Sequence, residues 1–230
     1  MAQLTGVMGR MKVYQLLYTG AMLSAVAALG AQESSDPKRA GKRPLLERSQ
    51  EITLARSGAP GNIADSASVY VFTDSGYVLA ARGSNGASCY VSRSWPTSLE
   101  PHCFDAEGAA SIMRIHMREV ELLHRGLTPD AAAREIGPEI LTGKLRLPVM
   151  PAMSWMFSAE QKLVNDRGQP AGRWRPHIMI YYPYLEAMPG TDGAPDFHAG
   201  MISGAGTAQS SIIVPVHDFV PVKPRPPAPL

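Results

Sequence analysis

The sequence predicts an α+β protein in which an antiparallel sheet carries two helices packed on one face. Three observations indicate this class. Short runs of β-branched and aromatic residues come first, two amphipathic segments follow, and extended runs return towards the end. Strands, then helices, then strands are typical of α+β domains, whereas a regular alternation would indicate a parallel sheet.

The first strands are expected to form a three-stranded meander over Ser68–Arg93. Three extended runs, at 68–72, 77–82 and 87–93, are separated by Asp74-Ser75-Gly76 and by Gly83-Ser84-Asn85-Gly86. Asn-Gly favours the positive φ of tight hairpin turns, and Asp, Ser and Gly are turn residues. Two tight turns would place the three strands side by side and antiparallel.

Two helices are predicted next, at about Asp105–Arg125 and at Pro129–Leu141. Asp105 is an expected N-cap for the first, and its apolar residues recur at helical spacing. Thr128 followed by Pro129 is a start signal for the second. Gly137-Pro138 is expected to break or kink this second helix.

The later extended runs complete the sheet. Residues 153–157 are compatible with a strand or a short turn, and 178–182 and 211–216 are predicted strands. Pro215 indicates an edge position for the last strand, because proline lacks the N–H that a sheet needs.

Residues 1–31 are typical of a signal peptide. They contain Arg10 and Lys12 but no acid, followed by an apolar run that ends in small residues. The run is shorter and more diluted than the roughly 20 apolar residues of a membrane span. We therefore expect cleavage and an exported protein, in the periplasm or outside the cell, without a membrane anchor. Translation from Met11 instead of Met1 would leave this pattern in place.

The remaining organisation follows from composition. Residues 32–50 are polar and charged and are expected to be a disordered linker whose basic cluster 38–43 is solvated. One folded domain is expected over 51–220. Residues 221–230 are Pro-rich and are expected to be a disordered, extended tail.

The charge balance argues against a nucleic-acid partner. The chain has 22 basic and 20 acidic residues. Because the predicted leader contributes two basic residues and no acid, the mature chain is formally neutral. A neutral chain lacks the positive surface that nucleic-acid binding requires. Other partners and the oligomeric state are left open.

Cys89 and Cys103 are the two cysteines. An even count in an exported chain predicts a disulfide, which would close a loop of about 15 residues and contribute about 3 kcal/mol. The alternative is a reactive thiol at Cys103, beside His102 and ahead of a helix N-terminus. The surrounding cluster of Glu100, His102, Cys103, Asp105 and Glu107 could form a metal site or an acid/base pair. More simply, Asp105 caps the helix, Glu107 complements its dipole and His102 lies in a loop.

Two metal sites are considered, although no cofactor is predicted. A zinc-type site would need His102, His177, His198 and His217 to converge with nearby carboxylates, as in a metal-assisted hydrolase. A copper site would use the three thioethers Met150, Met153 and Met156. Methionine is also a routine core residue. The common nucleophile, phosphate and dinucleotide motifs are absent.

Three stretches, 76–96, 101–108 and 175–179, resemble segments of exported bacterial proteins of unknown function. The resemblance covers about 69–216 and implies no activity, cofactor or catalytic residue. The leading hypothesis is therefore a non-enzymatic binding or envelope-associated protein. A metal-assisted hydrolase and a periplasmic copper-binding protein are the alternatives.

Overall fold

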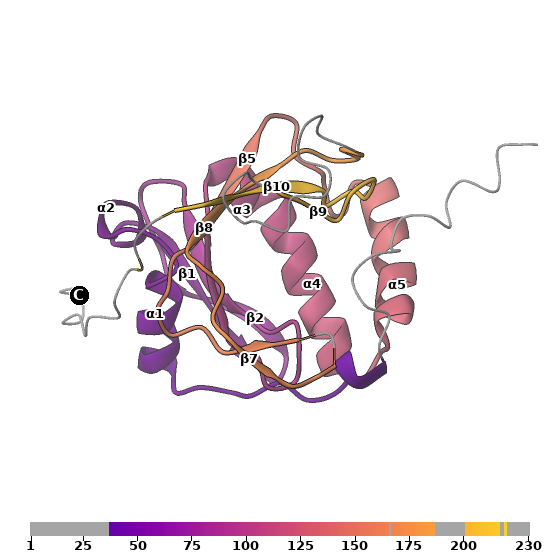
Figure 1. Cartoon of the computed structure of the whole chain (residues 1–230), viewed down its shortest axis with the longest axis horizontal. Helices are drawn as coiled ribbons and strands as arrows, with labels where there is room; N and C mark the ends of the chain where they lie inside the picture. Colours follow the sequence, from indigo (N-terminus) through magenta and orange to yellow (C-terminus); the bar gives the residue numbers. More distant parts are fainter. Residues whose placement is uncertain (1–36, 166, 187–200, 217–218, 220–230) are drawn as a thin grey trace, which may run out of the picture.

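The computed structural model describes residues 37–165, 167–186, 201–216 and 219. The predicted leader 1–31 and the Pro-rich tail 221–230 lie outside these residues. The chain has an α+β fold built on an eight-stranded mixed sheet of order β2-β1-β3-β4-β5-β8-β10-β9, with a separate hairpin β6-β7. Figure 1 shows the sheet between α1 on one side and α4 and α5 on the other.

The strands are β1 Ser68–Thr73, β2 Gly76–Ala81, β3 Ser88–Ser92, β4 Glu100–Phe104, β5 Ala152–Met156, β6 Leu163–Val164, β7 Pro170–Gly172, β8 His177–Tyr181, β9 Met201–Ser203 and β10 Ser211–Pro215. The helices are the 3-10 turn η2 Pro37–Arg39, α1 Arg48–Arg56, α2 Gly61–Ala64, α3 Ala106–Ala110, α4 Ile112–His124 and α5 Pro129–Leu141.

The predicted antiparallel meander is only partly correct. β1 and β2 form the expected hairpin, but β3 pairs in parallel with the other edge of β1. The loop between β2 and β3 crosses the end of β1, where the amide of Ser68 donates to the carbonyl of Ala87 at 2.9 Å. Gly83 makes this crossing possible, because a Cβ there would lie 2.2 Å from the Ser68 nitrogen. The side chain of Asn85 accepts from the amide of Ala87 and donates to the carbonyl of Ile63. Asn85-Gly86 therefore lies in the crossing loop and does not form a tight hairpin turn.

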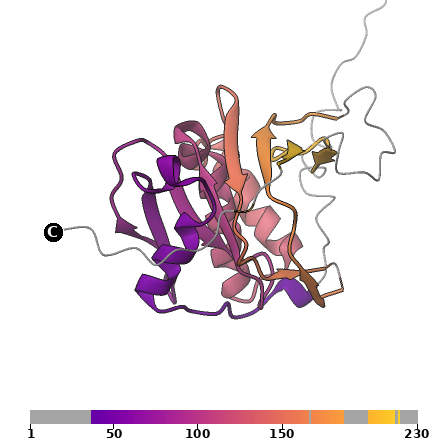
Figure 2. The ribbon, with the colours of Figure 1, turned by 60° about the vertical axis from the view of Figure 1, so that its left-hand side comes forward.

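Helices cover both faces of the sheet, not one as predicted. Residues on one face, including Tyr90 and Phe104, pack with α3, α4 and α5. Residues on the other, including Cys89 and Trp155, pack with Ala55 of α1. Figure 2 shows α1 in front of the strands and the two long helices behind them. Successive side chains of a strand point to opposite faces of the sheet, so the same strands contribute residues to both cores.

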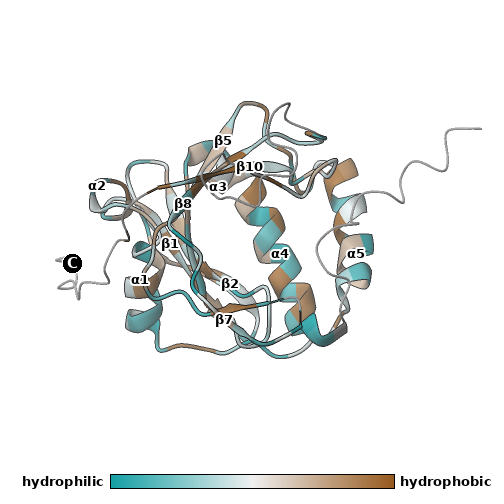
Figure 3. Ribbon diagram, viewed as in Figure 1, coloured by the Kyte–Doolittle hydropathy of each residue, from teal (hydrophilic) through white to brown (hydrophobic). Residues whose placement is uncertain are grey.

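The first predicted helix is divided in two. Asp105 caps α3 as expected, accepting from the amide of Gly108 at 2.7 Å. The backbone leaves helical geometry at Ser111, with φ −126° and ψ −92°, and α4 starts after it. Polar and apolar residues alternate around α4 in Figure 3, as one buried face requires.

The second helix, α5, has the predicted bounds and its predicted cap, Thr128. Pro138 lies inside it without ending it. β8 and β10 correspond to the two predicted later strands, and residues 153–157, left open between a strand and a turn, contribute to β5. β4, β6, β7 and β9 were not predicted. β10 is not an edge strand, because β8 and β9 flank it. Pro215 lies beyond the β9 pairs, which run from Ser211 to Ile213.

Residues 37–50 were predicted to be a flexible linker, but they lie against the domain. Arg39 and Arg43 of the basic cluster are buried rather than solvated. Arg43 donates to the carbonyls of Arg39 and Arg93 at 2.6 and 3.2 Å, and Arg39 to that of Ser94 at 3.2 Å. Burial lowers the pKa of Arg43 to about 10, so it stays cationic at neutral pH. Hydrogen bonds to the carbonyls of Arg93 and Ser94, which follow β3, therefore hold this segment against the sheet.

A buried ion pair joins α1 to the sheet. Glu51 and Arg93 have fully buried side chains and lie 2.9 Å apart. Glu51 also accepts from the amide of Phe72 at 2.8 Å, and Arg93 donates to the carbonyls of Pro44 and Val91. Because neither charged group contacts solvent, each needs the other as its counter-charge. This pair therefore positions α1 and the segment that precedes it.

Candidate functional site

The two cysteines form the predicted disulfide. Cys89 and Cys103 are directly opposite each other on β3 and β4, with Cα atoms 4.0 Å apart, and both are fully buried. The bond joins two neighbouring strands, because residues 100–104 form a strand instead of the predicted loop. Neither sulfur is a free thiol, so the cysteine nucleophile is excluded in this structure.

His102 lies in β4 and not in a loop. Its Nε2 is 2.8 Å from the hydroxyl of Ser154, which is 3.3 Å from the hydroxyl of Tyr181. His102 is 4% exposed and Ser154 is fully buried. Burial, and then the nearby His116 and His177, hold the pKa of His102 well below its ordinary value, so its ring is neutral.

His177 lies in β8, two strands from His102, and the strand registers place both side chains on the same face of the sheet. Its Nδ1 is 2.7 Å from the carbonyl of Arg175, so Nδ1 carries the proton. Burial lowers its pKa. His198 and His217 lie outside the described residues. Among the residues that are described, no three histidine, cysteine or carboxylate side chains form a group able to hold a metal.

The thioethers proposed for copper do not form one group. Met150 is 62% exposed, whereas Met156 is buried. Met153 packs against the core on the α1 side. Met153 and Met156 are three apart on β5, and an odd spacing places them on opposite faces of a strand. Sequence spacing alone could not reveal this, because it depends on residues 152–156 being a strand.

The acidic residues near His102 have structural partners. Glu107 accepts two bonds from Arg146, at 2.7 and 2.9 Å, and one from the amide of Val149 at 2.8 Å. These hydrogen bonds lower the pKa of Glu107. Glu100 accepts from the amide and hydroxyl of Ser94. Asp105 is the residue of this cluster that caps α3, and Glu100 and Glu107 accept hydrogen bonds from other protein groups.

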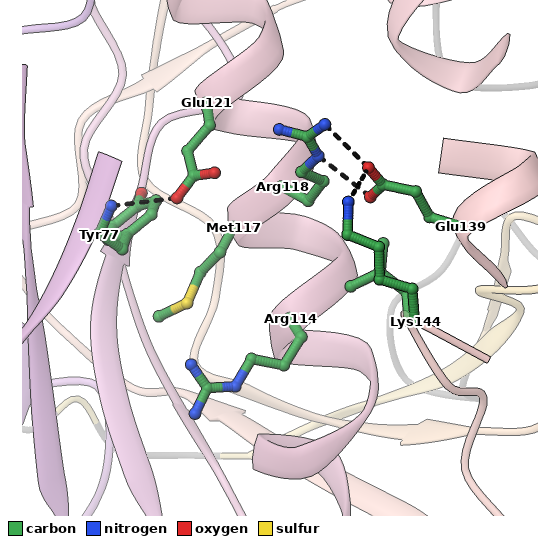
Figure 4. Close-up of a pocket in the computed structure, with 8 residues that line it drawn as sticks. Tyr77, Arg114, Met117, Arg118, Glu121, Glu139 and Lys144 are labelled. Carbon is green, nitrogen blue, oxygen red and sulfur yellow. Dashed lines mark hydrogen bonds and ion pairs between the residues drawn. The ribbon is translucent and has the colours of Figure 1, made fainter. Parts of the chain in front are cut away.

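A charged pocket lies beside α4, where the sequence indicated no site. It has a volume of about 310 Å³ and is lined by Tyr77, Arg114, Met117, Arg118, Glu121, Glu139, Lys144 and Leu145. Figure 4 shows Arg118 projecting from α4 towards Glu139 and Lys144, whereas Arg114, Met117 and Glu121 project from the side of α4 that faces β2 and Tyr77. The 114/117/118/121 spacing defines one helical face, which is a signal that sequence reading could have used.

The pocket's carboxylates are held by protein donors. Arg118 donates to both oxygens of Glu139, at 2.8 and 3.0 Å, and Lys144 donates to one of them at 2.6 Å. Burial raises the pKa of Glu139, but the bonds from Arg118 and Lys144 outweigh it and lower the pKa overall. Glu121 accepts from the amide of Tyr77 at 3.1 Å, which satisfies an outward N–H of the edge strand β2.

Comparisons with protein-family models, with curated proteins and with solved structures gave no match. None of the helices among the described residues has both the length and the hydropathy needed to cross a bilayer.

Proposed function

We propose that this protein is a non-enzymatic binding module that takes a small ligand in the pocket beside α4. The observation that supports this most directly is an open pocket of about 310 Å³ lined by charged and apolar groups. Small-molecule sites start at about 300 Å³ and combine apolar walls with a few convergent polar groups. Met117 and Leu145 supply apolar surface here, and three cationic side chains supply polar contacts.

The buried position of His102 and Ser154 favours binding over catalysis. A catalytic hydroxyl and its base must come within hydrogen-bond distance of the reacting atoms. Ser154 has no exposed surface, and its partners are His102 and Tyr181 of the core. A neutral imidazole bonded to a buried hydroxyl is a satisfied core contact.

We further propose that the protein is exported. The apolar, acid-free leader supports this, and so does the disulfide, since disulfides persist in oxidising compartments. The metal-assisted hydrolase and the copper-binding protein remain alternatives. Zinc or copper analysis of protein purified from the periplasm without chelator tests both, and stoichiometric metal would favour them.

Methyl NMR of methionine-labelled protein tests the binding proposal. Met117 lines the pocket, whereas Met150 is exposed elsewhere, so its methyl signal is a matched reference. A screen of small metabolites should contain compounds that shift the Met117 signal and leave Met150 in place. The proposal fails if no compound of the screen shifts the Met117 signal. Hydrolysis of model esters that is abolished in Ser154→Ala would instead indicate an enzyme.

A further inference from the structure

We infer that the ligand of this pocket carries a carboxylate or phosphate group and that Arg114 binds it. This inference rests on the proposed function and adds the chemical class of the ligand. The pocket lining contains three cationic side chains, Arg114, Arg118 and Lys144, and two carboxylates, Glu121 and Glu139. Its formal charge is therefore positive by one unit, which one anionic group would balance.

Both carboxylates accept hydrogen bonds from the protein, and Glu139 is also paired with two cations. Glu139 accepts hydrogen bonds from Arg118 and Lys144, and one oxygen of Glu121 accepts a hydrogen bond from the amide of Tyr77. A cationic ligand would have to compete with these bonds. The lining is therefore less suited to a cation than its count of acids suggests.

Arg114 has N–H donors that remain available for a ligand. It is exposed and forms no ion pair with a carboxylate among the described residues. Its Nη2 donates to the hydroxyl of Tyr70 at 2.6 Å, and its guanidinium carbon lies 4.6 Å from the centre of that ring. Guanidinium has five N–H donors in a planar fork. Tyr70 thus orients Arg114 while leaving donors that match the two oxygens of a carboxylate or phosphate.

Apolar surface lies one helical turn from Arg114. Tyr77 and Leu145 are half-buried and line the pocket, and Met117 lines it with only 4% of its surface exposed. Figure 4 shows Met117 between Arg114 and Glu121. The complementary ligand is therefore a small organic acid or phosphate monoester whose apolar body contacts the apolar side chains that line the pocket while its anionic group meets Arg114.

Four compounds with the same ring separate the contributions of charge and apolar surface. Benzoate and phenyl phosphate are anionic, benzamide is neutral and benzylamine is cationic. Titration of the Met117 methyl signal should show at least one anion binding about tenfold or more tighter than benzamide, equivalent to about 1.4 kcal/mol. The preferred anion distinguishes a carboxylate from a phosphate ligand. Because Arg114 is exposed, raising the salt concentration should weaken this binding.

Substitutions test the assigned residue. Arg114→Gln should weaken binding of the preferred anion by about tenfold or more. Arg134→Gln, an exposed arginine on α5 outside the pocket, is the matched control and should bind as the parent does. Tyr70→Phe keeps the ring under Arg114 and should retain binding. Urea unfolding curves of the variants establish that they are folded.

The outcomes separate this inference from the proposed function. If benzamide or benzylamine shifts Met117 at lower concentration than both anions, the pocket binds ligands but the anion inference is wrong. The same holds if Arg114→Gln binds the anions as tightly as Arg134→Gln does. If none of the four compounds shifts Met117, the anion inference also fails, and the metabolite screen decides the proposed function by itself.

Discussion

Neutralising Glu51 should destabilise the protein strongly. Glu51 and Arg93 lie 2.9 Å apart with no exposed surface. At an effective dielectric constant of about 20, two charges at this distance attract by about 6 kcal/mol. Glu51→Gln keeps an oxygen for the Phe72 amide but leaves Arg93 buried without a counter-charge. Its bonds to the carbonyls of Pro44 and Val91 recover part of the loss, so we expect a cost of about 3–5 kcal/mol.

Urea unfolding at pH 7, followed by tryptophan fluorescence with the disulfide intact, measures this cost. Glu135→Gln changes an exposed glutamate of α5 and should stay within about 0.5 kcal/mol of the parent. The double variant Glu51→Gln/Arg93→Met should lose less than the sum of the two single variants, because each single change removes the same interaction. A loss below about 1 kcal/mol for Glu51→Gln would show that water reaches the pair and would refute this reasoning.

Three further predictions concern the disulfide, the histidines and the strand crossing. Replacing Cys89 and Cys103 by alanine should lower the free energy of unfolding in urea by about 3 kcal/mol, and the reduced parent protein should lose a similar amount. If reductant does not change the unfolding curve of the parent, the disulfide is contradicted. The pKa of His102 is lowered by burial, so the unfolded chain takes up its proton first as the pH falls below about 6.5. Stability should be highest above that pH and fall below it by up to about 1.4 kcal/mol per pH unit for this residue. His102→Gln should flatten this slope between pH 6.5 and 5, and an unchanged slope would exclude His102 as its source. Gly83→Ala should unfold at markedly lower urea than Gly137→Ala, because a Cβ at 83 meets the Ser68 backbone whereas one at 137 meets open space; equal midpoints would argue against the crossing.

Local signals predicted the elements that local chemistry specifies. Thr128 and Pro129 start α5 as expected, and Asp105 caps α3. Both signals work within one helical turn, so distant contacts do not alter them. α1 was missed because its cap is Glu47, which accepts from the amides of Ser49 and Gln50 although glutamate is not a favoured N-cap.

For the candidate site, too, local sequence signals predicted some features, whereas others depend on the tertiary structure. The disulfide was predictable from cysteine count and the leader, since neither requires knowledge of the fold. The separation of Met153 from Met156 and the burial of His102 depend on which strands those residues enter. The pocket was missed because Tyr77, Arg114 and Glu139 come from distant parts of the chain.

The sequence by itself determined the α+β class, the bounds of α5, the cysteine pairing and the expectation of export, because these depend on local propensity and on composition. Only the tertiary structure decided the parallel pairing of β3 with β1, the helix on the second face and the grouping of charges beside α4. Strand order and side-chain convergence depend on contacts between residues far apart in the chain. No local pattern encodes them, and Gly83 has its decisive effect only where it meets the backbone of Ser68.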